Sequence, residues 1–169
     1  MADALPSTGR SPEIAPDDDV YGWLIGSWEL DVRRYRGDVS ARNLKGEVHF
    51  AWVLEGRAVQ DVWIMPQLSE RTPQLDKTCN MYGTTLRVWD ASLKAWRITW
   101  INPVTGAHNE LIGRWSGKDI VQIGAHNGTP VRWMFTEITP NSFRWTGEVL
   151  EEDGATWRLE GEFLARRMR

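Results

Sequence analysis

The sequence predicts an all-β fold, an up-and-down antiparallel β-barrel of about ten strands with a short N-terminal helical turn. Three observations lead to this prediction. Short segments with alternating apolar and polar residues follow one another from Trp28 to the C-terminus, and this is the period of a half-buried strand. Turn-forming pairs such as Asn127-Gly128 separate them. No stretch of real length carries the helical period.

Length and composition limit the class of protein. The 169 residues suit one domain, which we place at 18–169, after a Pro-, Ser- and Asp-rich segment, 1–17, expected to be a disordered tail. A net charge of −3 excludes a basic surface that would hold nucleic acid or an anionic membrane. The single cysteine, Cys79, excludes an internal disulfide framework. Because no apolar leader or long apolar run is present, we expect a cytoplasmic protein.

The ordered part opens with a short apolar turn, Trp23–Ile25, and a first strand. Asp19 and the two aspartates before it can cap this turn. Gly26 lets the backbone bend sharply, and Trp28 has enough apolar surface to plug one end of a closed sheet. These residues predict a barrel that is closed at the end where the chain enters.

The clearest hairpin joins strands over 46–54 and 57–65 through the two residues Glu55-Gly56. That loop length places Phe50 opposite Asp61. The face expected to point inward carries Val48, Phe50, Trp52, Leu54, Val59, Trp63 and Met65, with Asp61 in its midst.

The remaining strands are expected over 81–89, 96–101, 108–116, 120–125, 131–138, 143–150 and 156–165. Residues 66–78 form a long loop that can act as a lid over an open end. Closing the sheet would remove both exposed edges. The alternative is a pair of packed sheets in which the last strand does not meet the first.

Eleven tryptophans are the unusual feature of the composition. They either line a broad aromatic interior or fill it completely. In five strands a Trp stands directly beside an Arg, which predicts Trp inside and Arg outside because neighbours on a strand point to opposite faces. The candidate ligand-binding residues are Phe50, Trp52, Trp63, Met65, Trp100, Trp115, Trp133, Phe135 and Trp145.

Two carboxylates are candidates for acid–base chemistry. Asp61 is predicted among apolar side chains, where desolvation raises a carboxyl pKa toward the range that a general acid or base needs. The competing interpretation is a structural ion pair with an inward arginine, for which the candidates are Arg34, Arg57 and Arg87. Glu137 shares a predicted face with Trp133 and Phe135 and is a second candidate; its alternative is a surface residue at a strand end.

Metal and nucleophile motifs are absent from the sequence. The spacing of His49, His108 and His126 matches no ligand motif, so we expect no metal site. The chain carries no Gly-rich phosphate loop and no Gly-x-Ser-x-Gly elbow.

Gly26-Ser27-Trp28, which opens the first strand just after a helical turn, resembles the opening of the calycin barrels. These are the lipocalins and their shorter relatives, including nitrobindin-like proteins and small bacterial calycin-like domains. The resemblance implies a barrel that holds a hydrophobic or aromatic small molecule. It also implies a late arginine packed over the first-strand Trp28, for which Arg158 and Arg166 are the candidates. Haem-binding barrels of the nitrobindin type use a histidine close to the C-terminus; this chain has none after His126, so we expect no haem and no other cofactor.

Three functions remain open. The first is a binding protein that takes up a hydrophobic or aromatic small molecule in an aromatic-lined cavity. The second is a cofactor-independent enzyme (isomerase, cyclase, lyase or hydrolase) with Asp61 as its acid or base. The third is a filled barrel that acts as an interaction module or homodimer.

Overall fold

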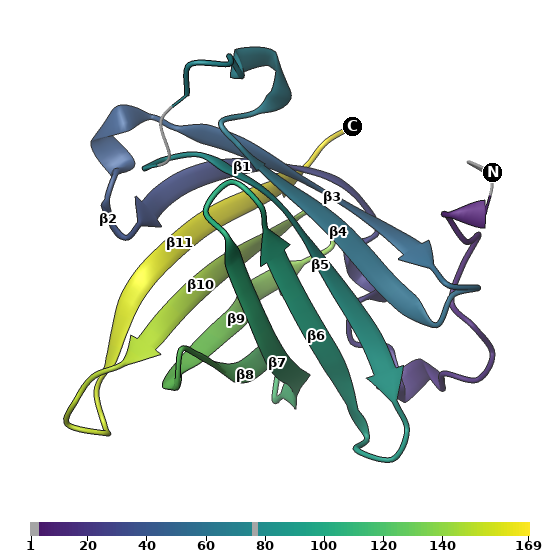
Figure 1. Ribbon diagram of the computed structural model, residues 1–169. Coiled ribbons are helices and arrows are strands. Elements are labelled where there is room, and N and C mark those ends of the chain that lie inside the picture. The colour runs from purple at the N-terminus through teal and green to yellow at the C-terminus, as the bar shows by residue number, and fades with distance from the viewer. Residues whose placement is uncertain (1–3, 76–77) are drawn as a thin grey trace.

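The computed structural model describes residues 4–75 and 78–169, which form a closed antiparallel barrel (Figure 1). Its long strands are β1 (Gly26–Tyr35), β3 (Lys45–Val53), β4 (Ala58–Met65), β5 (Met81–Asp90), β6 (Ala95–Asn102), β7 (Ala107–Ser116), β8 (Asp119–His126), β9 (Thr129–Thr139), β10 (Ser142–Leu150) and β11 (Trp157–Arg167). Each pairs with the next along the chain, and β11 pairs with β1 to close the sheet. The up-and-down barrel is therefore confirmed, and the alternative of two packed sheets is excluded.

Short elements complete the fold. β2 (Gly37–Asp38) folds back on the end of β1, and the described residues include the 3-10 turns η2 (Pro16–Asp18), η3 (Gly22–Leu24), η4 (Ser40–Arg42) and η5 (Leu68–Glu70). The predicted helical turn is η3, and Asp19 caps it by accepting a hydrogen bond of 2.7 Å from the Gly22 N–H. The sequence indicated only loops where β2, η4 and η5 lie. None of the helical turns in the described residues is long and apolar enough to cross a membrane.

The β3–β4 hairpin has the predicted register, with Phe50 opposite Asp61. The loop, however, is longer than predicted. It spans residues 54–57, with the Gly56 N–H donating to the Val53 carbonyl at 3.0 Å. Leu54 has a φ of 54° and a 56% exposed side chain. Its expected inward position is wrong, because the left-handed turn begins at Leu54 and takes it out of the alternating strand.

The N-terminal segment packs against the barrel. The sequence predicts a disordered tail over 1–17, but the structure places residues 6–13 along the β3–β4 hairpin. The Ser7 N–H donates to the Trp52 carbonyl at 2.7 Å, and the Ser11 N–H donates to the Gly56 carbonyl at 2.9 Å. The apolar Ile14 side chain is only 2% exposed. Burial of Ile14 and the two backbone bonds explain why a segment of polar composition is held in place.

The segment around η3 closes one end of the barrel. Trp28 is fully buried, and its indole N–H donates to the Leu24 carbonyl at 2.7 Å. Gly26 has a φ of 123°, which lets the chain turn from η3 into β1. The predicted plug is thus the structure's closed end.

The arginine that covers Trp28 is Arg167, whose guanidinium lies 4.1 Å from the ring centroid. The candidates Arg158 and Arg166 are both wrong. Arg166 stands opposite Glu29 on the outward side of the β1–β11 pair, whereas Arg167 stands opposite Trp28 itself. Arg158 is bound on the surface to Glu151 and Glu160. Alternation along β11 decides which arginine shares the inward face with Trp28.

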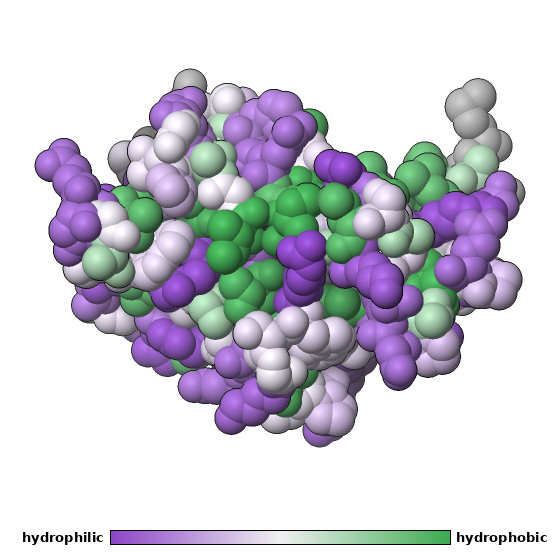
Figure 2. Space-filling view, turned by 90° about the horizontal axis from the view of Figure 1, so that it is seen from below, coloured by the Kyte–Doolittle hydropathy of each residue, from purple (hydrophilic) through white to green (hydrophobic). Residues whose placement is uncertain are grey.

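The outer face of the barrel is not uniformly polar. Figure 2 shows a face on which hydrophobic side chains gather in the middle and hydrophilic ones lie around them. Ile123 on β8 is 49% exposed and stands opposite Ile112 on β7, and Ile101 on β6 is 45% exposed.

Candidate functional site

A cavity of about 200 Å³ occupies the part of the barrel away from η3. Its wall is aromatic and comes from strands that lie far apart in the sequence: Trp63 on β4, Trp100 on β6, Trp133 on β9, Trp145 on β10 and Phe163 on β11. Trp145 lies 5.7 Å from Trp133, 5.8 Å from Trp63 and 5.3 Å from Phe163, measured between ring centroids. The rings therefore form one continuous apolar surface around the space.

Four of the nine predicted ligand-binding residues line this cavity: Trp63, Trp100, Trp133 and Trp145. Four others are buried in the core without lining it: Phe50, Trp52, Met65 and Phe135. Alternation correctly predicted that these side chains point inward, but it contains no information on how far along the barrel axis the solid core extends.

Trp115 is the exception, with 39% of its surface exposed. It lies one residue before the end of β7, so its ring projects at the rim and takes no part in the cavity. The predicted alternation still holds at this pair, because Trp115 stands opposite the buried Ile120 and Arg114 is exposed, but the position at the strand end leaves the Trp115 ring uncovered. In the middle of the wall Trp96 is fully buried and Arg97 is exposed.

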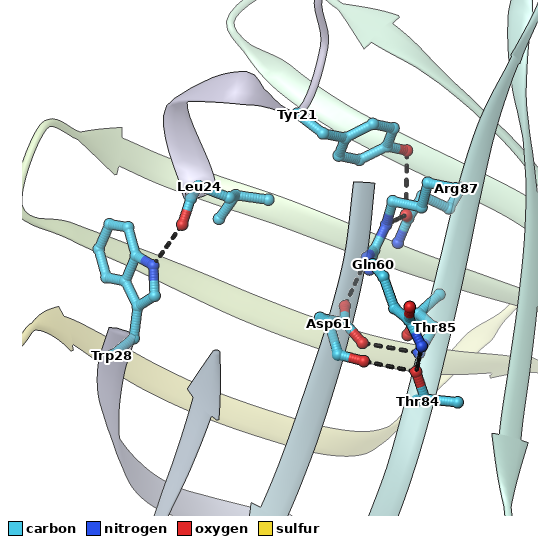
Figure 3. Close-up of polar contacts among 9 residues, drawn as sticks. Tyr21, Leu24, Trp28, Gln60, Asp61, Thr84, Thr85 and Arg87 are labelled. Atoms are coloured by element: carbon cyan, nitrogen blue, oxygen red, sulfur yellow. Dashed lines mark hydrogen bonds and ion pairs between the residues drawn. The ribbon is translucent and has the colours of Figure 1, made fainter. Parts of the chain in front are cut away.

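The inner end of the cavity is formed by Arg87 and Thr85 on β5. Arg87 is 1% exposed and donates through Nη1 to Asp61 Oδ2, while the Thr85 backbone N–H donates to Asp61 Oδ1 at 2.7 Å (Figure 3). Removing one partner of such a buried pair leaves an uncompensated charge, which is strongly destabilising. Asp61 and Arg87 thus form a structural ion pair, one of the two interpretations that the sequence allowed.

Gln122 and Tyr21, on the side of the closed end, also contact Arg87. Its Nε donates to Gln122 Oε1 at 3.2 Å, and the Tyr21 hydroxyl donates to the same oxygen at 3.0 Å. The guanidinium also lies 5.0 Å from the ring centroid of Tyr21 and 5.7 Å from that of Phe135. Burial raises the pKa of Tyr21, so its hydroxyl stays protonated and remains a donor.

The two candidate catalytic carboxylates differ in their surroundings, and neither lines the cavity. Both oxygens of Asp61 are occupied by protein donors, and the residue is 1% exposed. Glu137 is exposed and has a φ of 52°. The pairing of β9 with β10 shifts at this point, which turns Glu137 away from the face of Trp133 and Phe135 and makes its predicted inward position wrong.

Three indole N–H groups have acceptors in the described residues. At the closed end Trp23, Trp28 and Trp96 each donate to a backbone carbonyl, at 2.7–2.9 Å. The indole N–H groups of the four cavity tryptophans have no acceptor in residues 4–75 and 78–169, and neither has that of the buried Trp52, which does not line the cavity. The missing acceptors are therefore not a feature of the cavity alone.

The mouth is polar as well. Tyr35, Arg36, Asn102 and Glu160 line it, and the Arg36 backbone N–H donates to the Glu160 carbonyl at 2.7 Å. Burial raises the pKa of Tyr35. The expected lid over 66–78 includes residues 76–77, which lie outside the described residues; no described residue of this loop lines the cavity.

Sequence reasoning missed several wall residues: Tyr35, Met81, Thr85, Arg87 as a wall residue, and Phe163. A signal was present for β5, because Met81, Thr85 and Arg87 lie on the same face of that strand as Trp89, which is half-buried. For the histidines, His49 Nδ1 lies 2.8 Å from the Ser27 hydroxyl, and His126 Nδ1 lies 3.1 Å from Asn109 Nδ2. The described residues contain no group of three metal-ligating side chains.

No protein-family model matches the sequence, and no curated protein is significantly similar to it.

Proposed function

We propose that this barrel binds an apolar, planar small molecule in its tryptophan-lined cavity. The observation that supports the proposal most strongly is the set of four tryptophans and Phe163 that surround one unfilled space, with Arg87 and Thr85 at its inner end. An aromatic wall with a few available donors is the usual composition of a small-molecule site.

The size of the space limits the ligand. An apolar protein cavity of about 150 Å³ holds one benzene molecule, so a cavity of about 200 Å³ suits a fused two-ring compound. The closed barrel is compatible with the calycin-like resemblance of Gly26-Ser27-Trp28, and the calycin assignment is part of this proposal. Such barrels commonly hold one small ligand in the interior.

The geometry favours binding over the acid–base alternative. Asp61 does not line the cavity, whereas Arg87 and Thr85 do. One carboxylate oxygen of Asp61 accepts a hydrogen bond from Arg87, and the other accepts one from the Thr85 backbone N–H. A general acid or base must come within hydrogen-bonding distance of the substrate proton. Asp61 is therefore assigned the role of holding Arg87 in place.

The test is calorimetric titration with naphthalene of the wild-type chain, an Ala107→Phe variant and an Ala91→Phe variant. Ala107 lines the cavity, and Ala91 lies exposed in the β5–β6 turn. A phenyl ring at position 107 fills space that the ligand needs, so naphthalene affinity falls by ~10-fold or more, about 1.4 kcal/mol, while Ala91→Phe binds as wild type. Absence of naphthalene binding in the wild type, or equal binding in all three chains, contradicts the proposal.

A further inference from the structure

The inner end of the cavity carries one cationic donor whose charge is already neutralised. Arg87 uses Nε for Gln122 and Nη1 for Asp61, and its Nη2 has no partner in the described residues. The guanidinium is surrounded by the rings of Tyr21, Phe50 and Phe135. The distances from the Arg87 Cζ to the three ring centroids are 5.0–5.8 Å. It cannot turn away to find solvent, because its side chain is 2% exposed. A hydrogen-bond donor is therefore fixed at the deepest point of the site.

The rest of the wall beside Arg87 is mainly aromatic, and Thr85 contributes a hydroxyl that can donate or accept. The indole nitrogens of Trp63, Trp100, Trp133 and Trp145 can donate but cannot accept. The acceptor oxygens of Asp61 are occupied, and Glu148 and Glu160, the carboxylates that line the cavity, come from the strand ends near the mouth. A ligand that satisfies this wall must itself bring an acceptor.

The charge balance selects the kind of acceptor. Asp61 compensates the charge of Arg87, so a carboxylate placed beside Arg87 would bring an uncompensated negative charge into a largely apolar space. Burying an unpaired ion costs far more than burying a neutral group that makes one hydrogen bond. A carbonyl oxygen accepts a hydrogen bond without adding charge.

We infer that the ligand is a neutral fused-ring aromatic carbonyl compound whose oxygen accepts a hydrogen bond from Arg87 at the inner end of the cavity. The inference rests on the proposed function and adds the polarity and orientation of the ligand. Asp61 acts as a positioning residue, because it holds the guanidinium and neutralises it. The tryptophan rings pack on the two faces of the ligand.

Three bicyclic probes test this on the wild-type chain by calorimetric titration: naphthalene, chromone and 2-naphthoate. Naphthalene has no acceptor, chromone has a neutral carbonyl and 2-naphthoate has a charged carboxylate. One hydrogen bond from a charged donor gives chromone an affinity about tenfold higher than that of naphthalene, and 2-naphthoate binds most weakly. The carbonyl stretching frequency of bound chromone lies below its value in hexane, as a direct sign of the hydrogen bond.

A paired variant locates the donor. Asp61→Leu combined with Arg87→Met removes both charges together, so that neither is left buried alone. Chromone affinity falls about tenfold to the level of naphthalene, and naphthalene affinity itself is unchanged. Thr84→Val is the matched control that keeps the ion pair, because the Thr84 side chain contacts Gln60 and the Asp61 backbone carbonyl and does not line the cavity; it retains the preference for chromone over naphthalene.

The outcomes separate the two proposals. If no probe binds the wild type, the proposed function fails and this inference with it. If naphthalene and chromone bind equally, or 2-naphthoate binds most tightly, the cavity still takes aromatic ligands but the neutral-carbonyl inference is overturned. An unshifted carbonyl frequency overturns it as well, and that measurement does not depend on the paired variant being folded.

Discussion

Arg167 connects the last strand to the segment that closes the barrel. Beyond its contact with Trp28, its Nη1 donates to the Ile25 carbonyl at 2.8 Å and its Nη2 donates to the Trp23 carbonyl at 2.7 Å. One side chain thereby satisfies carbonyls at the end of η3 that have no partner within so short a turn. Arg167 thus links the last strand, β11, to the segment around η3 that closes the barrel.

Replacement of Arg167 by alanine tests this role. The loss of the cation–π contact and two charge-assisted hydrogen bonds lowers the free energy of unfolding by about 2 kcal/mol. Arg166→Ala is the control, since Arg166 is an exposed neighbour and its removal changes stability by less than about 0.5 kcal/mol. Urea unfolding monitored by tryptophan fluorescence measures both; equal losses in the two variants would show that Arg167 has no special role.

Asp61 shows what the sequence can and cannot predict about a single residue. The short β3–β4 loop placed it opposite Phe50 in an apolar setting, and this is confirmed. Its partner could not be chosen among Arg34, Arg57 and Arg87. The choice depends on the β4–β5 register, in which Asp61 stands opposite Thr85, and the long segment between these strands leaves that register undetermined by local sequence.

At the level of elements, the strands were predictable and their connections were less so. Alternation is a local property, and every predicted strand agrees with the structure to within one or two residues at each end. The four-residue turn at 54–57, the bulge at Glu137 and the short β2 depend on backbone conformations with positive φ or on pairing with distant residues. Non-glycine residues such as Leu54 and Glu137 give no sequence signal for that conformation.

The β5–β6 turn is held by a network centred on Asp90. Its Oδ1 accepts hydrogen bonds from the Ser92 hydroxyl at 2.6 Å and the Ser92 N–H at 2.9 Å, and its Oδ2 accepts from Arg97 Nε at 2.7 Å. The Ser92 hydroxyl first, and then Arg97, lower the pKa of Asp90 from 3.8 to about 2. The carboxylate form therefore contributes stability above the unfolded-state pKa, and the contribution is lost as pH falls through the folded-state pKa.

Asp90→Asn is expected to be less stable than the wild type at about pH 6, with a difference that shrinks as the pH falls from about 4 to about 2. Below that window the wild-type carboxyl is also neutral, so the two chains converge. Thermal midpoints measured across this range give the comparison. A difference that stays constant with pH would mean that the charge of Asp90 does not hold the turn.

At the scale of the whole molecule, the sequence predicted an aromatic interior but not whether that interior is hollow. The answer depends on where rings from distant strands meet. Trp63 on β4 lies 5.6 Å from Phe163 on β11, and Trp100 on β6 lies 6.4 Å from Trp133 on β9, between ring centroids. Such distances are set by barrel closure through β1 and β11, which no local pattern contains.

Because the cavity wall combines strands from both halves of the barrel, a bound ligand bridges surfaces that meet only in the closed fold. Ligand binding should therefore stabilise the barrel as one cooperative unit. Chromone at about 100 times its dissociation constant adds about 2.7 kcal/mol, which corresponds to a rise of about 5–10 °C in Tm for a chain of this size.

Circular dichroism in the far and near ultraviolet follows the strands and the tryptophans separately. Both melting curves should move upward together in the wild type. In Ala107→Phe, whose added ring occupies part of the cavity and weakens binding by ~10-fold or more, both should move by about half as much or less at the same chromone concentration. A shift confined to the near-ultraviolet signal would place the ligand on a locally unfolding part of the structure. That result would contradict a site built across the closed barrel.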